Sequence, residues 1–319
     1  MKAIRIHEFG GAEGLRVDEV EKPAAGAGEV LIKTAAAGIN FADVMLRQGK
    51  YFFRPTLPFT PGFEVAGTIE QIGSGVENWR VGQRVLAMNR SGGYAEYASA
   101  DAKTLVPIPD NMSFGEATAL LVQGLTALGL LADLKAGQTV LIHAAAGGVG
   151  SLLVQIAKHK GATVLGTASS AEKLEKIANL GADVGINYTE DDWTQEVLQA
   201  TGGKGADLII EMVGGEIGRR NFECLAAGGT MIVYGAVSGE DFQISALSLL
   251  GKMQTVKGYN LNLESRENIA RFTEELMNLV SGNKLQVMVQ EFPLEKAAEA
   301  HKAIEDRKTT GKVVLTISQ

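Results

Sequence analysis

The sequence predicts an α/β protein of two domains, an N-terminal β-barrel domain and a domain built on a doubly wound parallel sheet. Residues 1 to about 110 contain short β-type runs separated by glycine and proline. From about residue 113, helical patterns alternate with buried strands, as in sheets with crossover helices. A glycine-rich turn at 144–150 lies between a short apolar strand and an amphipathic helix, which is the layout of a nucleotide-binding unit.

Each expected element follows from local composition. The N-terminal strands are expected at 15–20, 30–36, 64–72, 84–88, 94–98 and 104–107. The parallel sheet is expected to contain strands 139–142, 163–167, 184–187, 207–213, 230–234 and 254–259, with helices at 152–160, 171–180, 191–200 and 216–226. The tail predicts a helix at 264–281, a strand at 285–290, a helix at 294–306 and a strand at 312–317.

The tail is expected to pack back on the N-terminal domain, because six strands already complete the parallel sheet. The predicted domains are therefore 1–118 with 262–319, and 119–261.

Composition limits the class of protein. With 45% hydrophobic and 21% charged residues, the chain of 319 residues can bury a core. A net charge of −7 without a basic run disfavours a nucleic-acid partner. No signal peptide is apparent, and Glu116 and Gln123 interrupt the most apolar stretch, so we expect a cytoplasmic protein without a membrane contact. The single cysteine, Cys224, excludes a disulfide framework and a Cys-rich zinc site, and we expect a buried thiol.

The turn at 144–150 has the pattern Ala-x-Gly-x-x-Gly, in which alanine replaces the first glycine of the dinucleotide motif. A strand, a tight turn and a helix start would place the pyrophosphate of a nucleotide on the helix N-terminus. The predicted contacts are Ala145, Gly147, Gly148, Val149 and Gly150. His143, at the end of the buried strand, is expected to be structural.

The end of the second strand predicts which nucleotide binds. NAD sites place an acidic residue here to bind the ribose 2′-hydroxyl, whereas this chain has Thr167, Ser169 and Ser170, with Lys173 following. Hydroxyls and an ammonium favour a 2′-phosphate, so the predicted cofactor is NADPH.

Other cofactor contacts are expected around this strand end and at later strand ends. Tyr188 either flanks the phosphate, stacks on adenine or is a surface residue. Gly214, Tyr234 and Gly235 follow later strands, whose carboxyl ends line the cofactor crevice.

Four motifs in order give the chain a family resemblance. They are Ala37-Gly-Ile-Asn-Phe-Ala-Asp43, Pro61-Gly-Phe-Glu-Val-Ala-Gly67, Gln123-Gly-Leu-Thr-Ala127 and His143-Ala-Ala-Ala-Gly-Gly-Val-Gly150. Together they resemble the zinc-free NADPH:quinone oxidoreductase (zeta-crystallin-like) branch of the medium-chain dehydrogenase/reductase superfamily. The resemblance implies a GroES-like β-barrel catalytic domain, a Rossmann-fold cofactor domain and hydride transfer from NADPH.

The resemblance also shows which metal ligands are missing. Zinc-dependent members carry a cysteine where this chain has Asn40 and a histidine where it has Phe63. Glu64 remains, but one carboxylate does not replace a Cys/His/Cys set. We therefore expect no metal, and an acceptor that is already electrophilic, such as a quinone or an α,β-unsaturated carbonyl.

The resemblance places Asn40, Asp43, Tyr51 and Thr126 around the nicotinamide and the substrate. Asn40 is expected to bond the substrate oxygen, or the nicotinamide ribose or amide; the alternative is a turn residue. Tyr51 is the expected donor to a developing oxyanion, unless it only packs.

Some neighbouring roles stay open. Asp43 is either a helper of the catalytic groups or a helix-terminus residue. Phe52, Phe53 and Phe59 form either an aromatic substrate wall or ordinary core, and a contact of Lys312 with cofactor phosphates is also open.

Two other functions are considered. One is a reductase of enoyl thioesters such as acryloyl-CoA, for which Arg47, Lys50 and Arg54 would supply a basic patch. The other is a crystallin-like cofactor-binding protein with little catalysis, or an RNA-interacting one, which the acidic balance disfavours. In each case the strand at 254–259 would be a sheet edge, so a homodimer through it is expected, with a tetramer as the alternative.

Overall fold

The computed structural model describes residues 1–89 and 91–318, and the chain forms two compact units. Unit 1 comprises Met1–Val122 and Met288–Gln319, and unit 2 comprises Gln123–Val287. These bounds differ from the predicted ones mainly at 262–287, which belong to unit 2. The reason is helix α9 (Arg266–Ser281), which packs on α3 (Leu125–Leu130) of unit 2.

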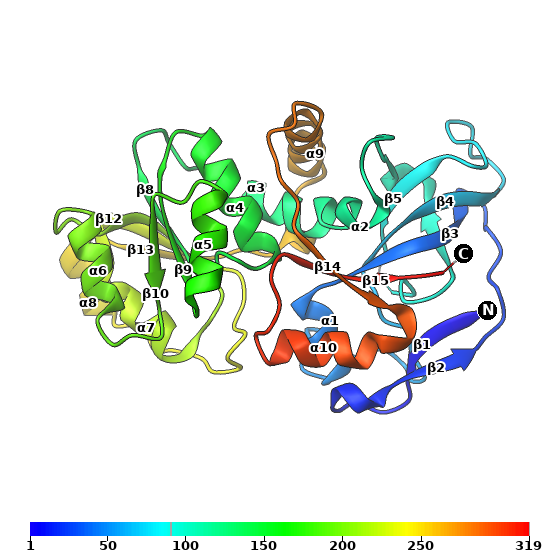
Figure 1. The fold of residues 1–319 in the computed structure, drawn as a ribbon, viewed down its shortest axis with the longest axis horizontal. Helices are drawn as coiled ribbons and strands as arrows, with labels where there is room; N and C mark the ends of the chain where they lie inside the picture. Colours follow the sequence, from blue (N-terminus) through cyan, green and yellow to red (C-terminus); the bar gives the residue numbers. More distant parts are fainter. Residues whose placement is uncertain (90, 319) are drawn as a thin grey trace. The chain divides into compact units, whose positions relative to one another are not determined.

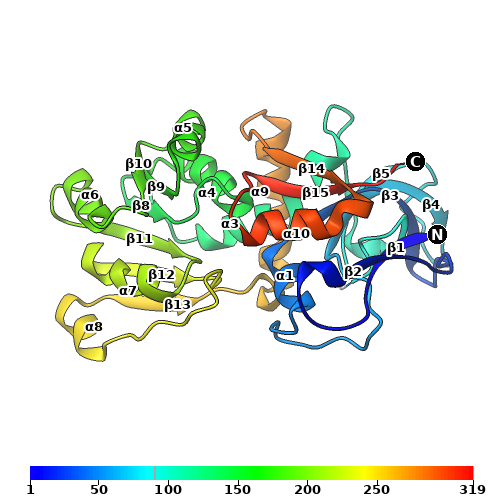
Figure 2. The ribbon, with the colours of Figure 1, turned by 60° about the horizontal axis from the view of Figure 1, so that its bottom comes forward.

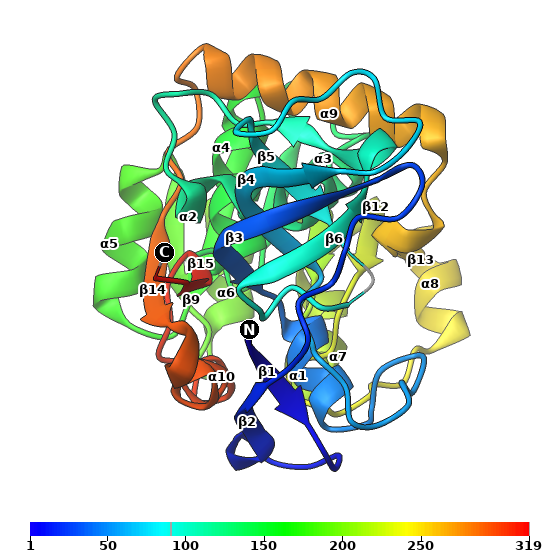
Figure 3. The same cartoon turned by 90° about the vertical axis from the view of Figure 1, so that its right-hand side faces the viewer.

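Unit 1 is built on a seven-stranded sheet in the order β14-β15-β3-β4-β5-β7, with β6 pairing with β3 (Figure 3). The strands are β3 (Glu29–Ile39), β4 (Glu64–Ile72), β5 (Arg84–Met88), β6 (Tyr97–Asp101), β7 (Val106–Pro107), β14 (Val289–Pro293) and β15 (Lys312–Thr316). Because β15 pairs antiparallel with β3, the chain end completes this sheet, as predicted for the tail strands.

Smaller elements complete unit 1. They are the antiparallel pair β1 (Lys2–Ile6) and β2 (Leu15–Glu19), and helices α1 (Phe41–Arg47), α2 (Phe114–Ala117) and α10 (Ala297–Glu305). Helix α10 runs beside β14 and β15 (Figure 2). The core includes the strand residues Ile32, Val65 and Leu315, together with Tyr94.

Unit 2 contains a fully parallel six-stranded sheet in the order β10-β9-β8-β11-β12-β13, which confirms the doubly wound fold. Its strands are β8 (Thr139–Ile142), β9 (Thr163–Ala168), β10 (Val184–Asn187), β11 (Ala206–Glu211), β12 (Leu225–Val233) and β13 (Thr255–Gly258). Strand β13 is an edge of the sheet, as the sequence predicted.

The helices α4 (Gly148–His159) and α5 (Ala171–Asn179) cover one face of this sheet, and α6 (Trp193–Ala200) and α7 (Gly215–Cys224) cover the other (Figure 1). The chain order reverses between β8 and β11, so the loops after these two strands meet at the same sheet edge.

Several elements differ from prediction: α1 was not expected, and β12 begins five residues earlier than the predicted strand at 230–234. Helix α8 (Ala246–Lys252) was not expected, and β14 begins four residues later than the predicted strand. Gln286 cannot join the sheet because its backbone N–H and C=O both bond the side chain of Gln155 on α4. Within 1–89 and 91–318, no helix has both the length and the apolar character that a membrane span requires.

Candidate active site

The glycine-rich turn joins β8 to α4 in unit 2. Gly147 is the N-cap of α4, and the N–H of Ser151 makes the first helical bond back to its carbonyl, at 2.9 Å. The preceding N–H groups, those of Gly148, Val149 and Gly150, therefore have no intrahelical partner. A Cβ on Gly150 would lie 2.3 Å from the carbonyl oxygen of Ala144, so only glycine allows this close packing. The turn offers backbone donors and a helix dipole to an anion.

The side chain of Gln123 covers the start of α4. Gln123 is only 7% exposed, and its Oε1 has no hydrogen-bond partner among the residues described. A Cβ on Gly148 would lie 2.2 Å from the Gln123 Nε2, so glycine leaves room for this amide. An unpaired carbonyl oxygen therefore lies beside the anion-binding helix start. No role for Gln123 was predicted, and its place at the start of the motif 123–127 is the one signal that could have indicated it.

The end of β9 supplies the other predicted cofactor residues. Ser170 is the N-cap of α5, and its hydroxyl accepts the backbone N–H of Lys173 at 3.4 Å. Ser169, Ser170 and Lys173 are half-buried, and the Tyr188 backbone N–H bonds Ala168 at 3.3 Å, which brings these residues together. Thr167, in contrast, is fully buried, and its hydroxyl bonds His143, so its side chain does not face a ligand.

A buried hydrogen-bond network in unit 2 joins the glycine turn to β9, α7 and the end of β11. His143 Nδ1 lies 3.1 Å from Thr167 Oγ1, and its Nε2 lies 2.7 Å from Asn221 Oδ1. The Asn221 Nδ2 donates to Glu211 Oε2 at 2.5 Å. Glu211 Oε1 accepts the backbone N–H groups of Val213 and Gly214. His143 is structural, as predicted, and it links the glycine turn to the loop after β11.

Two loops at the carboxyl ends of β11 and β12 lie next to this network. Gly214 has a φ of +80°, and a Cβ there would lie 2.5 Å from the Glu240 carbonyl oxygen. The Tyr234 N–H bonds the Glu211 carbonyl at 3.0 Å. Burial, followed by the Glu211 charge, raises the pKa of the Tyr234 phenol well above its usual value. Gly235 follows directly, against Met212.

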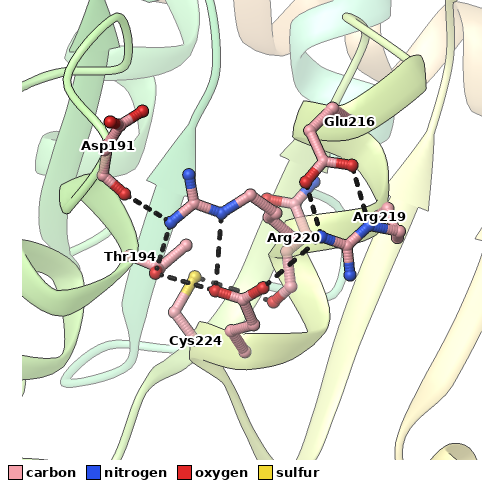
Figure 4. Close-up of polar contacts among 8 residues, drawn as sticks. Asp191, Thr194, Glu216, Arg219, Arg220 and Cys224 are labelled. Atoms are coloured by element: carbon pink, nitrogen blue, oxygen red, sulfur yellow. Dashed lines mark hydrogen bonds and ion pairs between the residues drawn. The ribbon is translucent and has the colours of Figure 1, made fainter.

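Cys224 is a buried thiol, as predicted. Its sulfur donates to the Asn221 carbonyl at 3.6 Å, and burial raises its pKa to about 12, so the reactive thiolate is suppressed. Figure 4 shows Cys224 beside a group of polar contacts that involve α7. Arg219 pairs with Glu216 within the helix, and Arg220 donates to the backbone carbonyl of Asp191. These contacts are structural.

In unit 1, Asn40 precedes α1 and lies in a buried charged cluster. Its Nδ2 donates to Glu64 Oε1 at 2.9 Å, and its Oδ1 accepts from Lys312 Nζ at 2.9 Å. Lys312 also forms an ion pair with Glu64, whose Oε2 accepts the Val122 N–H at 3.1 Å. Glu64 and Lys312 have no exposed surface, whereas Asn40 is 8% exposed. Lys312 is therefore not a surface cation free to meet phosphates.

Asp43 lies on the first turn of α1 beside this cluster. Its carboxylate accepts the N–H groups of Asn40 at 2.8 Å and Gly62 at 3.1 Å. Burial raises the pKa of Asp43 to about 7, although those two bonds and Lys312 oppose the shift. Asp43 is completely buried, so it fixes the start of α1 and does not contact solvent.

A second buried chain continues from Asp43. The Tyr94 hydroxyl lies 3.1 Å from His301 Nε2, and burial, followed by the charge of Asp43, raises the pKa of Tyr94. Burial lowers the pKa of His301 to about 3, and the nearby Arg47 contributes. Arg47 is fully buried and bonds Glu305 at 2.6 Å. It therefore cannot serve in the basic surface patch considered for a thioester substrate.

Tyr51 lies in an aromatic group after α1. Its ring centroid is 5.1 Å from that of Phe52, 5.4 Å from Phe53 and 5.8 Å from Phe63. Phe52 is 84% exposed and Phe53 46% exposed, so neither is core. Phe59 packs on the core of unit 1 and bridges to Ile6.

The predicted catalytic residues divide between the units. Phe63 connects the aromatic group to Asn40, because the next residue, Glu64, bonds the amide. Asn40 and Asp43 are directly hydrogen-bonded in unit 1, and Tyr51 lies in the same unit, with its ring against that of Phe63. Thr126 lies in unit 2, on α3, and is 9% exposed.

The donor set around Glu64 does not suit a metal ion. Asn40 and Phe63 replace ligand-type side chains, and the Glu64 carboxylate is paired with an ammonium. Throughout residues 1–89 and 91–318, no group of three or more His, Cys, Asp or Glu side chains is arranged to hold one.

Comparisons with known proteins agree with both units. A family model described as zinc-binding dehydrogenase matches residues 148–281, and one described as alcohol dehydrogenase GroES-like domain matches residues 26–110. A quinone oxidoreductase of Rattus norvegicus is 36% identical, over 99% of this chain and 98% of its own length.

Solved structures give the same result. The Escherichia coli quinone oxidoreductase complexed with NADPH superposes with a TM-score of 0.93 at 32% identity, covering 99% of this chain and all of that one. A mycobacterial protein complexed with NADPH gives a TM-score of 0.92 at 37% identity, with the same coverage. The chain therefore belongs to the medium-chain dehydrogenase/reductase superfamily. Within it, the chain is a member of the quinone oxidoreductase branch, which confirms the resemblance found in its motifs.

Proposed function

We propose that the chain is an NADPH-dependent quinone oxidoreductase that transfers hydride to quinones or related α,β-unsaturated carbonyls without zinc. The observation that carries the proposal is the strand end after β9, where Thr167, Ser169 and Ser170 stand in place of the acidic residue of NAD sites and Lys173 follows. The match to relatives named quinone oxidoreductases, which extends over 98% or more of their length, supports the same conclusion.

The residues of unit 2 fit this cofactor. The free N–H groups of Gly148, Val149 and Gly150 would hold the pyrophosphate, with Ala145 and Gly147 shaping the turn. The buried, unpaired Oε1 of Gln123 supplies an acceptor for a cofactor hydroxyl or amide at the same helix start.

The 2′-phosphate would be bound at the start of α5. Ser169, Ser170 and Lys173 offer two hydroxyls, a helix N-terminus and an ammonium. Tyr188 would flank the adenosine, and Gly214, Tyr234 and Gly235 would contact the cofactor along the loops after β11 and β12. Thr167 acts through its bond to His143, as a support for the turn.

Bound NADPH supplies the hydride, and the protein must stabilise the negative charge that develops on the acceptor oxygen. Asn40 carries the amide that would donate to this oxygen, and Tyr51 would donate to it as the reduced product forms. The product takes one hydride and one proton, giving a hydroquinone or a saturated carbonyl. Asp43 fixes α1 and thereby Asn40, and Thr126 would contact the nicotinamide from α3.

The aromatic group around Tyr51 would exclude water from the reacting atoms and would pack against a planar acceptor. The thioester alternative is disfavoured, because Arg47 is buried and only Lys50 and Arg54 of the proposed patch are exposed. Without metal in the mechanism, purified protein is expected to contain less than stoichiometric zinc and to keep its activity in chelator.

The decisive experiment measures aerobic oxidation of NADPH with ortho-quinones, 2-alkenals and enoyl-CoA thioesters. Turnover is expected with quinones first and alkenals second. NADPH binding without turnover of any acceptor would refute the enzyme, and preference for enoyl-CoA would establish the thioester alternative.

The cofactor assignment has its own variant, Lys173→Ala. Loss of a charged hydrogen bond to the 2′-phosphate should raise the Kd of NADPH about tenfold or more, with little effect on NADH. An equal effect on both cofactors would show that Lys173 does not bind the phosphate.

We also propose that the chain is a cytoplasmic homodimer that pairs through β13. That strand is an open sheet edge, and the residues before it, Leu247, Leu250 and Met253, are each more than 70% exposed. Dependence on NADPH and a reduced, buried thiol suit the cytoplasm. Sedimentation equilibrium tests the assembly: Leu250→Glu should give monomers, and a wild-type monomer or tetramer would contradict it.

A further inference from the structure

The cluster around Asn40 brings together residues that are far apart in the sequence. Lys312 at the start of β15, Gly38 in β3 and Glu64 at the start of β4 lie on three neighbouring strands. Gly38 pairs with Glu64 on one side and with Val314 on the other, and side chains two residues apart share a sheet face. Glu64, Lys312 and Asn40 therefore project from the same face, around the position of Gly38.

Gly38 makes room for the ion pair. A Cβ at this position would lie 2.5 Å from Glu64 Oε1 and 2.8 Å from Lys312 Nζ. Any other residue here would displace the two charges. The absence of a side chain at Gly38 thus leaves room for the pair. A buried ion pair by itself contributes little net stability, because both charges lose their hydration.

The pair determines which way the Asn40 amide is turned. A lysine ammonium can only donate, so it must face the Asn40 Oδ1, and an ionised carboxylate can only accept, so it must face the Nδ2. One Nδ2 hydrogen is bonded to Glu64, and the other has no partner among residues 1–89 and 91–318. Asn40 is also the only one of the three with exposed surface.

We propose that Lys312, Glu64 and Gly38 are positioning residues that lock the Asn40 amide as a hydrogen-bond donor to the oxygen of the acceptor. The proposal rests on the proposed function, and it adds that the Asn40 side chain faces the acceptor as a hydrogen-bond donor. An amide fixed in this sense stabilises an oxygen that gains negative charge. In the flipped orientation it would oppose that charge.

The test is the double variant Glu64→Gln/Lys312→Met, which removes both charges and keeps the volumes. The glutamine amide can donate as well as accept, and methionine cannot donate, so both orientations of the Asn40 amide are allowed in this variant. We expect kcat for a quinone to fall about tenfold while KM changes less than about threefold. Gly38→Ala, which displaces the same pair, should give the same pattern. The matched control is Lys2→Met/Glu295→Gln, which neutralises an exposed Lys–Glu pair of unit 1 and should leave kcat unchanged.

A second measurement does not depend on turnover. With selective ¹⁵N-asparagine labelling, the Asn40 side-chain peaks are identified by their loss in Asn40→Leu. The two Nδ2 hydrogens should have widely separated chemical shifts in the wild type, and the hydrogen bonded to Glu64 should be slow to exchange. In the double variant, exchange should accelerate about tenfold or more, as expected when a buried bond is lost.

The outcomes separate the two hypotheses. If Asn40→Leu keeps the wild-type kcat, the catalytic role proposed for Asn40 is wrong. If Asn40→Leu loses kcat but the double variant does not, the positioning proposal is overturned. In the wild type, fast exchange of the Asn40 hydrogen that is bonded to Glu64 would also overturn it, even if the double variant failed to fold. Absence of turnover in the wild type would refute both.

Discussion

Each unit buries a carboxylate at a strand end, and the two carboxylates are stabilised in different ways. Glu211 in unit 2 accepts two backbone N–H groups and the Asn221 amide, and no lysine or arginine bonds it among the described residues. Glu64 in unit 1 pairs with the ammonium of Lys312. In the proposed function the cofactor brings its own anionic charge to unit 2, where the backbone around Glu211 only shapes the loop after β11. The role proposed for unit 1 is to stabilise a charge that appears on the acceptor during the reaction, which suits a fixed side-chain donor.

The largest expected effect comes from removing one charge of the unit 1 pair. Lys312→Met leaves Glu64 buried without a cation, which should lower the free energy of unfolding by about 3–5 kcal/mol. The double variant with Glu64→Gln should recover most of this loss, because no lone charge remains. Urea denaturation of the single and double variants measures the cycle. Equal losses in both would mean that the charges do not compensate each other.

The Asp43 carboxyl should make stability depend on pH. Its pKa of about 7 in the folded protein is above that of the unfolded chain, so the folded state binds the proton more tightly. The resulting stabilisation is fully present below about pH 4 and is lost as pH rises through about 7, on the order of a few kcal/mol.

The measurement is the difference in unfolding free energy between wild type and Asp43→Asn across this pH range. Asp43→Asn cannot titrate, so the wild type should lose stability relative to the variant between pH 4 and 7. A difference that stays constant with pH would show that Asp43 has an ordinary pKa in the folded protein.

The corresponding change in unit 2 is His143→Leu, which leaves Thr167 and Asn221 without their shared partner. We expect a loss of about 1–3 kcal/mol, since two buried polar groups become unpaired. Because His143 links two cofactor loops, the Kd of NADPH should also rise several-fold, about equally for NADH, in fluorescence titrations. Stability loss without any change in affinity would separate the network from the cofactor site.

The two carboxylates also show how far the sequence could predict the site. Glu211 bonds the backbone of residues two and three positions further along the chain, so these contacts are local in sequence. The glycine loop that they shape was predicted to follow a strand. Lys312 bonds Asn40 across 272 residues, and nothing in its own neighbourhood distinguishes it from a strand-terminal surface lysine. The parallel sheet was predictable because its strands are continuous apolar runs. Helix α8 was not, because it packs few of its apolar residues.

The smallest expected effect tests the start of α5, where Ser170 has two potential roles. Its hydroxyl caps the helix, and it also stands where the 2′-phosphate would bind. Ser170→Ala removes both functions and should lower stability by about 1 kcal/mol. Ser170→Asp keeps the cap, because aspartate accepts the same N–H and favours a helix N-terminus.

Ser170→Asp therefore isolates the contact with the phosphate. Its negative charge should repel the 2′-phosphate and raise the Kd of NADPH about tenfold, while NADH binding and stability stay near the wild-type values. Binding of both cofactors by the two variants, measured by fluorescence titration, decides between the roles. If Ser170→Asp binds NADPH as tightly as the wild type does, Ser170 is only a cap. Unit 2 would then have to select its cofactor through Ser169 and Lys173.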